Sequence, residues 1–491
     1  MEARRFFLGG GLRTAGFWSL SRASTAVAGV GGTVFLAVVA LLATGQPVAP
    51  VLVAGVAFMV WLVVKAVRAV RSVVREPDED RFERFLARRA GLNDHVEGSR
   101  PPLVLAGRRV MGVAATGDDP PLAVVEHGGK RPFFTAVVAL AGATRGLATV
   151  AEEDRAASAF GKFLTGLADP VVPVDQVDVM TRVWPADLGP WERWAEAQPI
   201  RSGLAAALDD SARLVTAMAS QHRSFLIVRM PIAAVAGKAR SESGRADRDT
   251  VFDLARATVG DVARRAKTAG LGPSFGLTPS LLAGLVHHLF VPSAPLDRWD
   301  GDADWWEAVP SFSSSPDGVA LVARDESRST WWHSVVSVRQ GGWPSDPVDA
   351  TVLERLTAGL DGAPIRTVVA QFPLIERSAA VVRARGASAL AEADATETAM
   401  KGQVSTGDAE RRQDLGRWLL DDLSMGAAAT TPSLRLMLSA PGRHAALDAR
   451  QAAAARFQEL GFWRLDWHLG DQGRAVAACL PFGLGTKGLR R

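Results

Sequence analysis

Cysteine and tyrosine are the residue types that this chain of 491 residues nearly or wholly lacks. It has one cysteine, Cys479, and no tyrosine, although it has 14 tryptophans and 20 phenylalanines. A single cysteine excludes an internal disulfide and any metal site built from cysteines, and it is typical of a reducing compartment. Nothing in the sequence explains the absence of tyrosine.

Lysine is also scarce. The chain has 56 basic residues, of which seven are Lys, and its net charge is +4. The arginines are scattered through sequence rich in Ala and Val, which indicates a compositional bias rather than a basic surface for nucleic acid. We therefore expect no direct binding to nucleic acid.

Motifs for catalysis are missing too. Lys162 and Lys238 each follow a glycine, but neither pair has the earlier glycine or the following Ser/Thr of a phosphate-binding loop. The adjacent His287 and His288 lie on a predicted helix, where neighbouring side chains point about 100° apart, so one should face the core and one the solvent. The sequence predicts no catalytic, cofactor-binding or metal-binding residue.

The longest uncharged stretch is Ala23 to Val64, and it contains two apolar runs joined by "TGQPVAP". The first run, Thr25 to Thr44, would cover about 30 Å as a helix, which is the thickness of the hydrocarbon core of a bilayer. A hairpin buried in a soluble core would need polar residues on its outer faces, and none exist here. The stretch therefore predicts a transmembrane helical hairpin.

Basic residues flank this hairpin on both sides, whereas the turn between its helices has no charge. By the positive-inside rule we expect both ends of the hairpin, and both termini of the chain, to lie in the cytoplasm. Arginines and lysines in front of the lipid headgroups are more typical of a plain flank than of specific lipid recognition. The membrane-flanking residues are Arg22, Lys65, Arg68 and Arg71, with Trp18 and Trp61 at interfacial depth.

The fold class that we expect is α+β, with the two-helix transmembrane hairpin followed by a cytoplasmic body of two lobes, each built from a mixed sheet and helices. Strand, helix, glycine and strand follow one another in both 224–275 and 433–469, which suggests that the lobes are alike. A helix is also expected across 191–222, and a half-buried strand in "VDQVDVMTRVW" at 174–184. The expected domains are a basic tail at 1–22, the hairpin at 23–66, a juxtamembrane helix or linker at 67–97, and lobes at 98–328 and 329–491.

Two tryptophan pairs are candidate contact sites for a partner. Trp305 and Trp306 follow the acidic turn "DGDAD" (300–304), and Trp331 and Trp332 lie in a predicted strand. Such pairs are more often buried anchors than exposed platforms. If they are partly exposed, they are good candidates for a protein interface, where Trp is enriched.

The order of these parts resembles a family of actinobacterial membrane proteins whose genes lie in conjugative elements. In that family the body is similar to the N-terminal, non-motor half of type IV secretion ATPases, and the hairpin is similar to the small inner-membrane subunit that accompanies them. The resemblance implies that a motor domain would begin near "CLPFG", and that no catalytic residue is carried over. The segments that carry it are "LTPSLLAGLVHHLFVPSAP" (277–295), "IRTVVAQFPLIERSAAVVRARGASALAEADA" (365–395), "LRLMLSA" (434–440) and "RAVAACLPFGLG" (474–485).

The sequence thus favours a non-enzymatic scaffold subunit of a conjugative or type IV-like secretion apparatus. Its expected partners are membrane lipid, a separate cytoplasmic ATPase, other membrane subunits and a further copy of the chain. Two alternatives stay open. One is the E subunit of a type VII secretion core, and the other is a membrane-tethered enzyme of envelope metabolism with His287, His288 or the acidic turn at 300–304 in its site.

Overall fold

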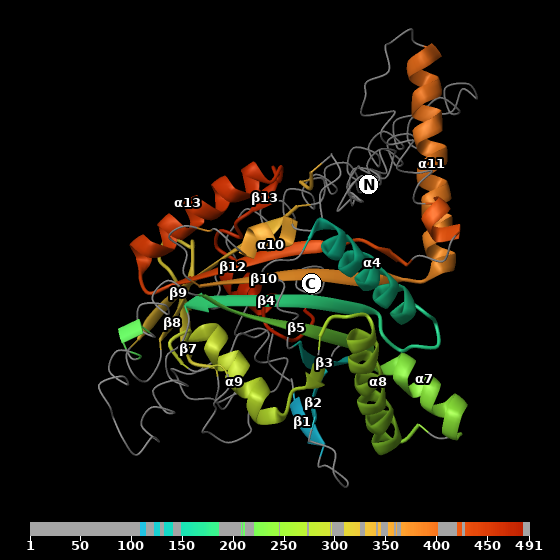
Figure 1. Ribbon diagram of the computed structural model, residues 1–491, viewed down its shortest axis with the longest axis horizontal. Helices are drawn as coiled ribbons and strands as arrows, with labels where there is room; N and C mark the ends of the chain where they lie inside the picture. Colours follow the sequence, from blue (N-terminus) through green and yellow to red (C-terminus); the bar gives the residue numbers. More distant parts are fainter. Residues whose placement is uncertain are drawn as a thin grey trace, which may run out of the picture. The chain divides into compact units, whose positions relative to one another are not determined.

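The computed structural model describes the body of the protein (Figure 1). No helix in this part of the chain is long and apolar enough to cross a membrane. The predicted hairpin and all its flanking residues lie outside the described residues. Those described are 109–113, 122–127, 132–140, 149–185, 208, 210–211, 220–244, 246–272, 274–294, 296, 309–324, 329–339, 342–344, 352–357, 360, 365–400, 420–424 and 428–484.

The described strands form one sheet in which every pairing is antiparallel. Its main path runs β1-β2-β3-β5-β4-β10-β12-β9-β8-β7, and the short strands β6, β11 and β13 pair with β3, β10 and β9. The strands are β1 Arg109–Val113, β2 Leu122–His127, β3 Phe133–Leu140, β4 Gln176–Pro185, β5 Ser220–Pro231, β6 Ser274–Gly276, β7 Ser311–Ser314, β8 Leu321–Arg324, β9 Thr330–Val338, β10 Ile365–Ile375, β11 Ala429–Thr430, β12 Ser433–Ala440 and β13 Leu465–Asp466.

The two halves of this sheet have the same topology. In the first half (β1–β6) the strands β1, β2 and β3 form a meander. The next strand, β4, lies at the centre of the sheet, and β5 then inserts between β3 and β4. The second half (β7–β13) repeats this order, and in both halves a short strand then pairs with the last strand of the meander. The central strands β4 and β10 are antiparallel. An approximate twofold axis perpendicular to the sheet, through the pair Met180–Val369, therefore relates the halves.

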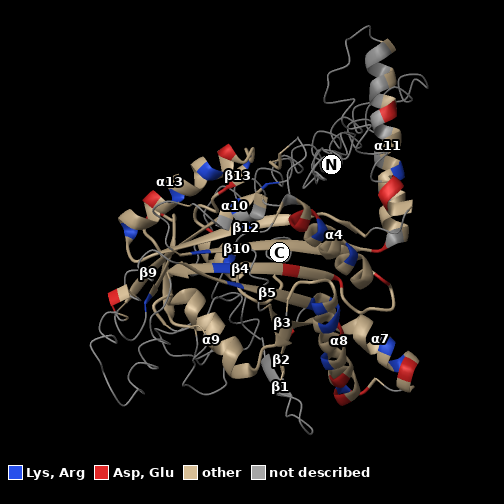
Figure 2. Ribbon diagram, in the orientation of Figure 1, with Lys and Arg blue, Asp and Glu red and all other residues tan. Residues whose placement is uncertain are grey.

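Helices cover both faces of the sheet, and each face has its own apolar core. One face packs against α4, α7, α8, α10 and α13, and the other against α9 and α14. Figure 2 shows the charged residues gathered mainly on the helices rather than on the strands. The helices are α4 Val150–Leu167, α7 Ile232–Ser243, α8 Arg248–Thr268, α9 Pro279–Phe290, α10 Val352–Thr357, α11 Arg377–Met400, α13 Arg443–Glu459 and α14 Gln472–Ala477.

Local sequence sets several helix ends. Thr149 and Glu152 form a capping box at the start of α4, and Asp247 accepts a hydrogen bond from the Thr250 amide at the start of α8. Thr278 caps α9 and Pro279 occupies its first position, as the sequence predicts. These side chains satisfy amides that the helix itself leaves without a partner.

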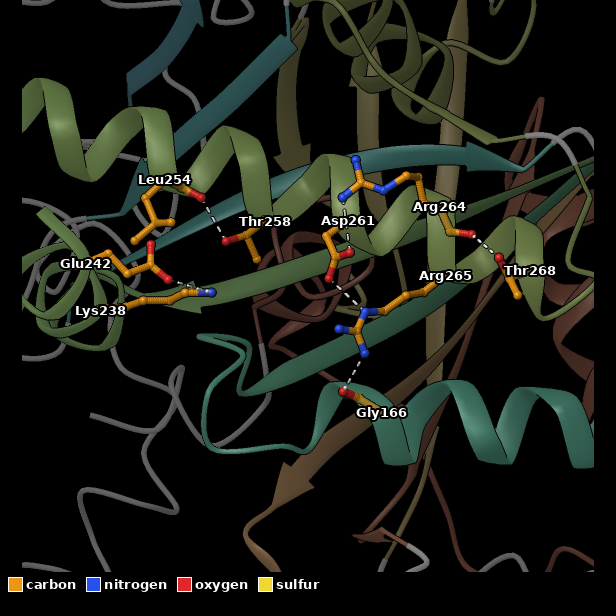
Figure 3. Close-up of polar contacts among 9 residues, drawn as sticks. All are labelled: Gly166, Lys238, Glu242, Leu254, Thr258, Asp261, Arg264, Arg265 and Thr268. Carbon is orange, nitrogen blue, oxygen red and sulfur yellow. Dashed lines mark hydrogen bonds and ion pairs between the residues drawn. The ribbon is translucent and has the colours of Figure 1, made fainter.

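A polar contact joins α8 to α4 on the first of these faces. Arg265 donates from Nε to Asp261 of its own helix at 2.7 Å and from Nη1 to the Gly166 carbonyl oxygen at 3.1 Å (Figure 3). A Cβ on Gly166 would lie 3.2 Å from the same nitrogen. The guanidinium thus links the two helices at a position where α4 has no side chain.

The repeated order predicted at 224–275 and 433–469 is present. In the first half β5, α8, Gly270 and β6 occur in this order, with the further helix α7 between β5 and α8, and in the second half β12, α13, Gly461 and β13 follow one another. Both glycines have positive φ, 74° and 80°, which only glycine adopts readily. The α+β class is confirmed.

Two expectations about the body differ from the structure. The predicted lobes on either side of residue 328 do not have separate sheets, because β4 pairs with β10 and makes their strands one sheet. The helix expected across 191–222 extends too far, because β5 begins at Ser220 and pairs with β4 from that residue. The short apolar run near Ser220 fits the end of a helix or the start of a strand equally well, and the pairing of β5 with β4 makes it a strand.

We predict opposite effects for two Gly-to-Ala substitutions. A Cβ on Gly342 would lie 2.7 Å from the Arg464 carbonyl oxygen and 2.9 Å from its amide nitrogen. Gly342→Ala should therefore lower the free energy of unfolding by about 1–3 kcal/mol. Gly260, in α8, has nothing within 4 Å of such a Cβ, so Gly260→Ala should raise it by up to about 1 kcal/mol. Urea unfolding of the full chain in lipid nanodiscs measures both, and equal effects would contradict the close approach at Gly342.

Candidate functional site

The most unusual feature of the body is a layer of buried polar and charged side chains on one face of the sheet. Side chains two apart on a strand share a face, and Met180, Val369, Met437 and Val335 lie in the core under α9 and α14. The polar residues two positions before or after them on the same strands therefore lie on that face as well. We call this set the polar layer: Asp178 and Arg182 on β4, His333 on β9, Thr367 and Gln371 on β10, and Arg435 and Ser439 on β12.

Arg182 is the largest fully buried member and has no negative partner among the described residues. Its side chain is 0% exposed. Nη1 donates to Thr367 Oγ1 at 2.7 Å, and Nη2 donates to the His288 carbonyl oxygen at 3.2 Å. Nε has no hydrogen-bond partner, and no described carboxylate forms an ion pair with the guanidinium. Burial lowers the pKa of Arg182 to about 9, which marks a cation that the fold holds at a cost.

Two neutral histidines lie beside Arg182. His333 donates from Nε2 to the Phe290 carbonyl oxygen at 2.9 Å, so its Nδ1 accepts from the Ser439 hydroxyl at 3.0 Å. His288 donates from Nδ1 to the Ala294 carbonyl oxygen at 2.6 Å. Burial and the nearby charge of Arg182 lower the pKa of each histidine to about 3. Both rings are therefore uncharged over the physiological range.

Two of these contacts join the halves of the body. Arg182, in the first half, donates to Thr367 in the second, and His333, in the second half, donates to the Phe290 carbonyl oxygen in α9 of the first half. We call residues 279–294 the first closing segment. The polar layer thus bonds the end of α9 to strands β4 and β9, while α9 also packs on β1 and β2 of its own half.

A second group of polar residues lies on the other side of the axis. Asp178 accepts from Gln176 Nε2 at 2.9 Å, and Arg435 donates from Nη2 to Gln371 Oε1 at 3.3 Å. Burial raises the pKa of Asp178 to about 6 against the opposing charge of Arg435, and burial lowers the pKa of Arg435. Gln176 Nε2 also donates to the Gly483 carbonyl oxygen at 3.1 Å.

The second group holds the end of the described chain in an equivalent way. Residues 472–484, the second closing segment, belong to the second half, and Gly483 contacts Gln176 of the first half. In this segment Cys479 is fully buried, and burial raises the pKa of its thiol to about 12. The thiol is therefore protonated. The helix of each closing segment packs on its own half, α9 on β1 and β2 and α14 on β8 and β9. A carbonyl oxygen near the end of each segment, that of Phe290 or Gly483, accepts from a residue of the other half.

The residues singled out from the sequence have varied positions. Trp331 is half-buried and packs against the core under α9, and Trp332, on the other face of β9, is also half-buried. Trp305, Trp306 and the acidic turn lie outside the described residues, so an interface at the tryptophans stays a prediction. His288 is 1% exposed, and His287 is half-buried. In the described ranges no group of three or more His, Cys, Asp or Glu side chains could hold a metal ion.

Sequence reasoning missed the polar layer. The strand at 174–184 alternates polar and apolar residues, and this pattern predicted one solvated face. In the structure Asp178 and Arg182 are 2% and 0% exposed, because α9 and the second closing segment cover that face. The available signal was the charge itself, since Asp178, Arg182 and Arg435 stand inside runs of apolar strand residues.

Comparison with known proteins adds no assignment. No protein-family model matches the chain, and no curated protein matches it. What the site can do chemically follows from its own residues. The polar layer is a buried, net positive environment whose hydrogen bonds are made to backbone and side-chain groups of the same chain.

The histidines should make stability depend on pH. Their folded pKa of about 3 lies below the unfolded value of about 6.5, so the unfolded chain binds protons first and stability falls as the pH drops below 6.5. Asp178 has the opposite sign, because its folded pKa of about 6 lies above its unfolded value. Between pH 5 and 6 His333→Gln should reduce the slope of unfolding free energy against pH by about 1 kcal/mol per unit.

Urea unfolding of the full chain in nanodiscs at several pH values measures this slope. His444→Gln is the matched control, because His444 is exposed on α13, and it should leave the slope unchanged. Equal slopes for His333→Gln and the parent protein would show that His333 is not held neutral.

Replacing Arg182 tests whether the cost of burying its charge exceeds the stabilisation from its hydrogen bonds. Arg182→Met removes a buried cation without a counter-ion and keeps most of the volume. We expect the free energy of unfolding to rise by about 1–4 kcal/mol. Arg324→Met, on an exposed residue at the end of β8, should change it by less than about 0.5 kcal/mol. A large loss for Arg182→Met in the same unfolding experiment would mean that its bonds to Thr367 and His288 outweigh the cost of its charge.

Proposed function

We propose that this protein is a membrane-anchored scaffold subunit of a conjugative or type IV-like secretion apparatus, and that it docks a separate cytoplasmic ATPase. The uncharged stretch from Ala23 to Val64, with basic residues on both sides, supports the membrane anchor. The four segments that resemble the non-motor half of secretion ATPases support the apparatus. Both termini and the body then lie on the cytoplasmic side.

The observation in the body that carries the scaffold role is how the polar layer is used. In many enzymes, buried groups with shifted pKa values face a cleft. Here Arg182 and His333 are covered by the first closing segment and donate to its carbonyl groups, and His288, which belongs to that segment, donates to the Ala294 carbonyl oxygen within it. Such bonds make one rigid body from two similar halves, which suits a part that holds other proteins in position.

The enzyme alternative has less support. It places His288 in an active site, but the ring is 1% exposed and donates to the Ala294 carbonyl oxygen. A type VII role shares the hairpin and the cytoplasmic body with the favoured one. Only the identity of the partners separates these two roles.

Co-purification tests the proposal. The full chain, tagged at its C-terminus, should sediment with membranes and should retain a co-expressed ATPase that has a phosphate-binding loop, lacks its own membrane anchor and is encoded beside it. A variant without residues 23–66 should leave the membrane fraction and still bind the ATPase, because the proposed docking surface is on the body.

Three results would count against the proposal. Recovery of the parent protein in the soluble fraction without detergent would remove the membrane anchor. Retention of type VII core subunits in place of the ATPase would favour the E-subunit role. Loss of turnover of a lipid or cell-wall precursor in His287→Ala, with assembly unchanged, would favour the enzyme.

A further inference from the structure

A small apolar hollow opens beside α9, at the end of β3 and β5. Its volume is about 90 Å³. Phe275, at its edge, is 49% exposed, although a side chain of this size is normally covered. The described side chains that form its wall are mainly aliphatic or aromatic, among them Ala139, Phe225, Leu277 and Leu285, and the one charged residue among them is Arg223.

Arg223 brings a positive charge to this hollow that no described carboxylate neutralises. It is exposed, and it makes no ion pair within the described part of the chain. In the strand register it lies directly opposite Arg182, and the two share a face because Phe225 and Met180 do. Like charges in this position repel one another, so an anion bound here would relieve the repulsion.

In the second half of the body, different side chains occupy the positions that correspond to the wall of the hollow. In the first half Ala139 pairs with Phe225 and Phe275. In the second half Ser337 takes the place of Ala139 and pairs with Arg435 and Asp466.

There the Ser337 hydroxyl forms a hydrogen bond with His468 Nε2 at 2.7 Å. Ser337 and His468 therefore satisfy one another on that side. On the first side the residues are apolar and leave a space.

The volume of the hollow decides between kinds of occupant. A cavity of about 150 Å³ holds one benzene molecule, so a hollow of about 90 Å³ accommodates one branched aliphatic side chain and not an acyl chain. Arg223 at its edge requires a carboxylate next to that side chain, since guanidinium and carboxylate form charge-assisted hydrogen bonds.

We propose that the hollow beside α9 binds a Leu or Ile side chain of a partner polypeptide that carries a carboxylate next to it. Arg223 binds the carboxylate, and Phe275 covers the aliphatic group. One side chain gives only weak binding, so this contact is the anchor of a larger interface. The inference goes beyond the proposed scaffold function and does not depend on it.

Titration of methyl-labelled protein with short peptides tests this site. The full chain is placed in lipid nanodiscs, because detergent monomers could fill an apolar hollow. The probes are acetyl-Gly-Gly-Leu with a free carboxyl end, acetyl-Gly-Leu-Asp-Gly-amide, and the same two peptides with the carboxylate replaced by an amide.

The methyl signals of Leu277 and Leu285 should shift when either carboxylate peptide is added. The protein should bind the carboxylate peptides at least about tenfold more tightly than the corresponding amide peptides. Decanoate is the lipid-like control and should not shift them.

Two variants make the result specific. Arg223→Gln, at an exposed position, should remove the preference for carboxylate, whereas Arg324→Gln on β8 should keep it. Ala139→Phe should fill the hollow and abolish the shifts. Three results would overturn the proposal: no shift of these methyl groups, equal binding of carboxylate and amide peptides, or a carboxylate preference that survives in Arg223→Gln. A stronger response to decanoate would assign the hollow to lipid instead.

Discussion

The pairing of β4 with β10 is the interaction on which the body depends. The two strands are about 190 residues apart in sequence, and they pair without a break from Arg366 with Val183 to Pro373 with Gln176. Every other strand of the main path is added outward from this pair. Because the strands are antiparallel, the two halves are related by a twofold axis rather than by a translation. The helices of both halves therefore lie on equivalent faces, and the closing segment of each half reaches across to the other.

The charges of the polar layer follow from this crossing. The end of each closing segment brings backbone carbonyl groups over a sheet face that would otherwise be apolar, and those groups need donors. Arg182, His333 and Gln176 supply them. Because the acceptors are neutral, the cation of Arg182 has no counter-ion in the described part of the chain, and the histidines beside it stay uncharged. The shifted pKa values of this layer are thus a consequence of how the halves are joined.

The sequence allowed good prediction of what is local and poor prediction of what is distant. The strand, helix, glycine and strand order around Gly270 and Gly461 was predictable, because periodicity and a glycine stop act within about 20 residues. The single sheet was not, because no local pattern distinguishes β4 paired with β10 from two separate sheets. For the same reason the alternation around Asp178 and Arg182 suggested a solvated face, since the two segments that cover it lie about 100 and about 300 residues further along the chain.

The equivalence of the halves also shows where they have diverged. At the place where β3 and β9 each pair with a short strand, the second half has Ser337 and His468 in hydrogen-bonding contact. The first half has Ala139 and Leu277 there, and neither can donate or accept through its side chain. The backbone pairing is the same at both places, so the difference lies in the side chains. The second half pairs Ser337 with His468 at this place, whereas the first half exposes Phe275 and also Arg223, which forms no ion pair with a described carboxylate. The first half is therefore where the chemistry of the body remains open to another molecule.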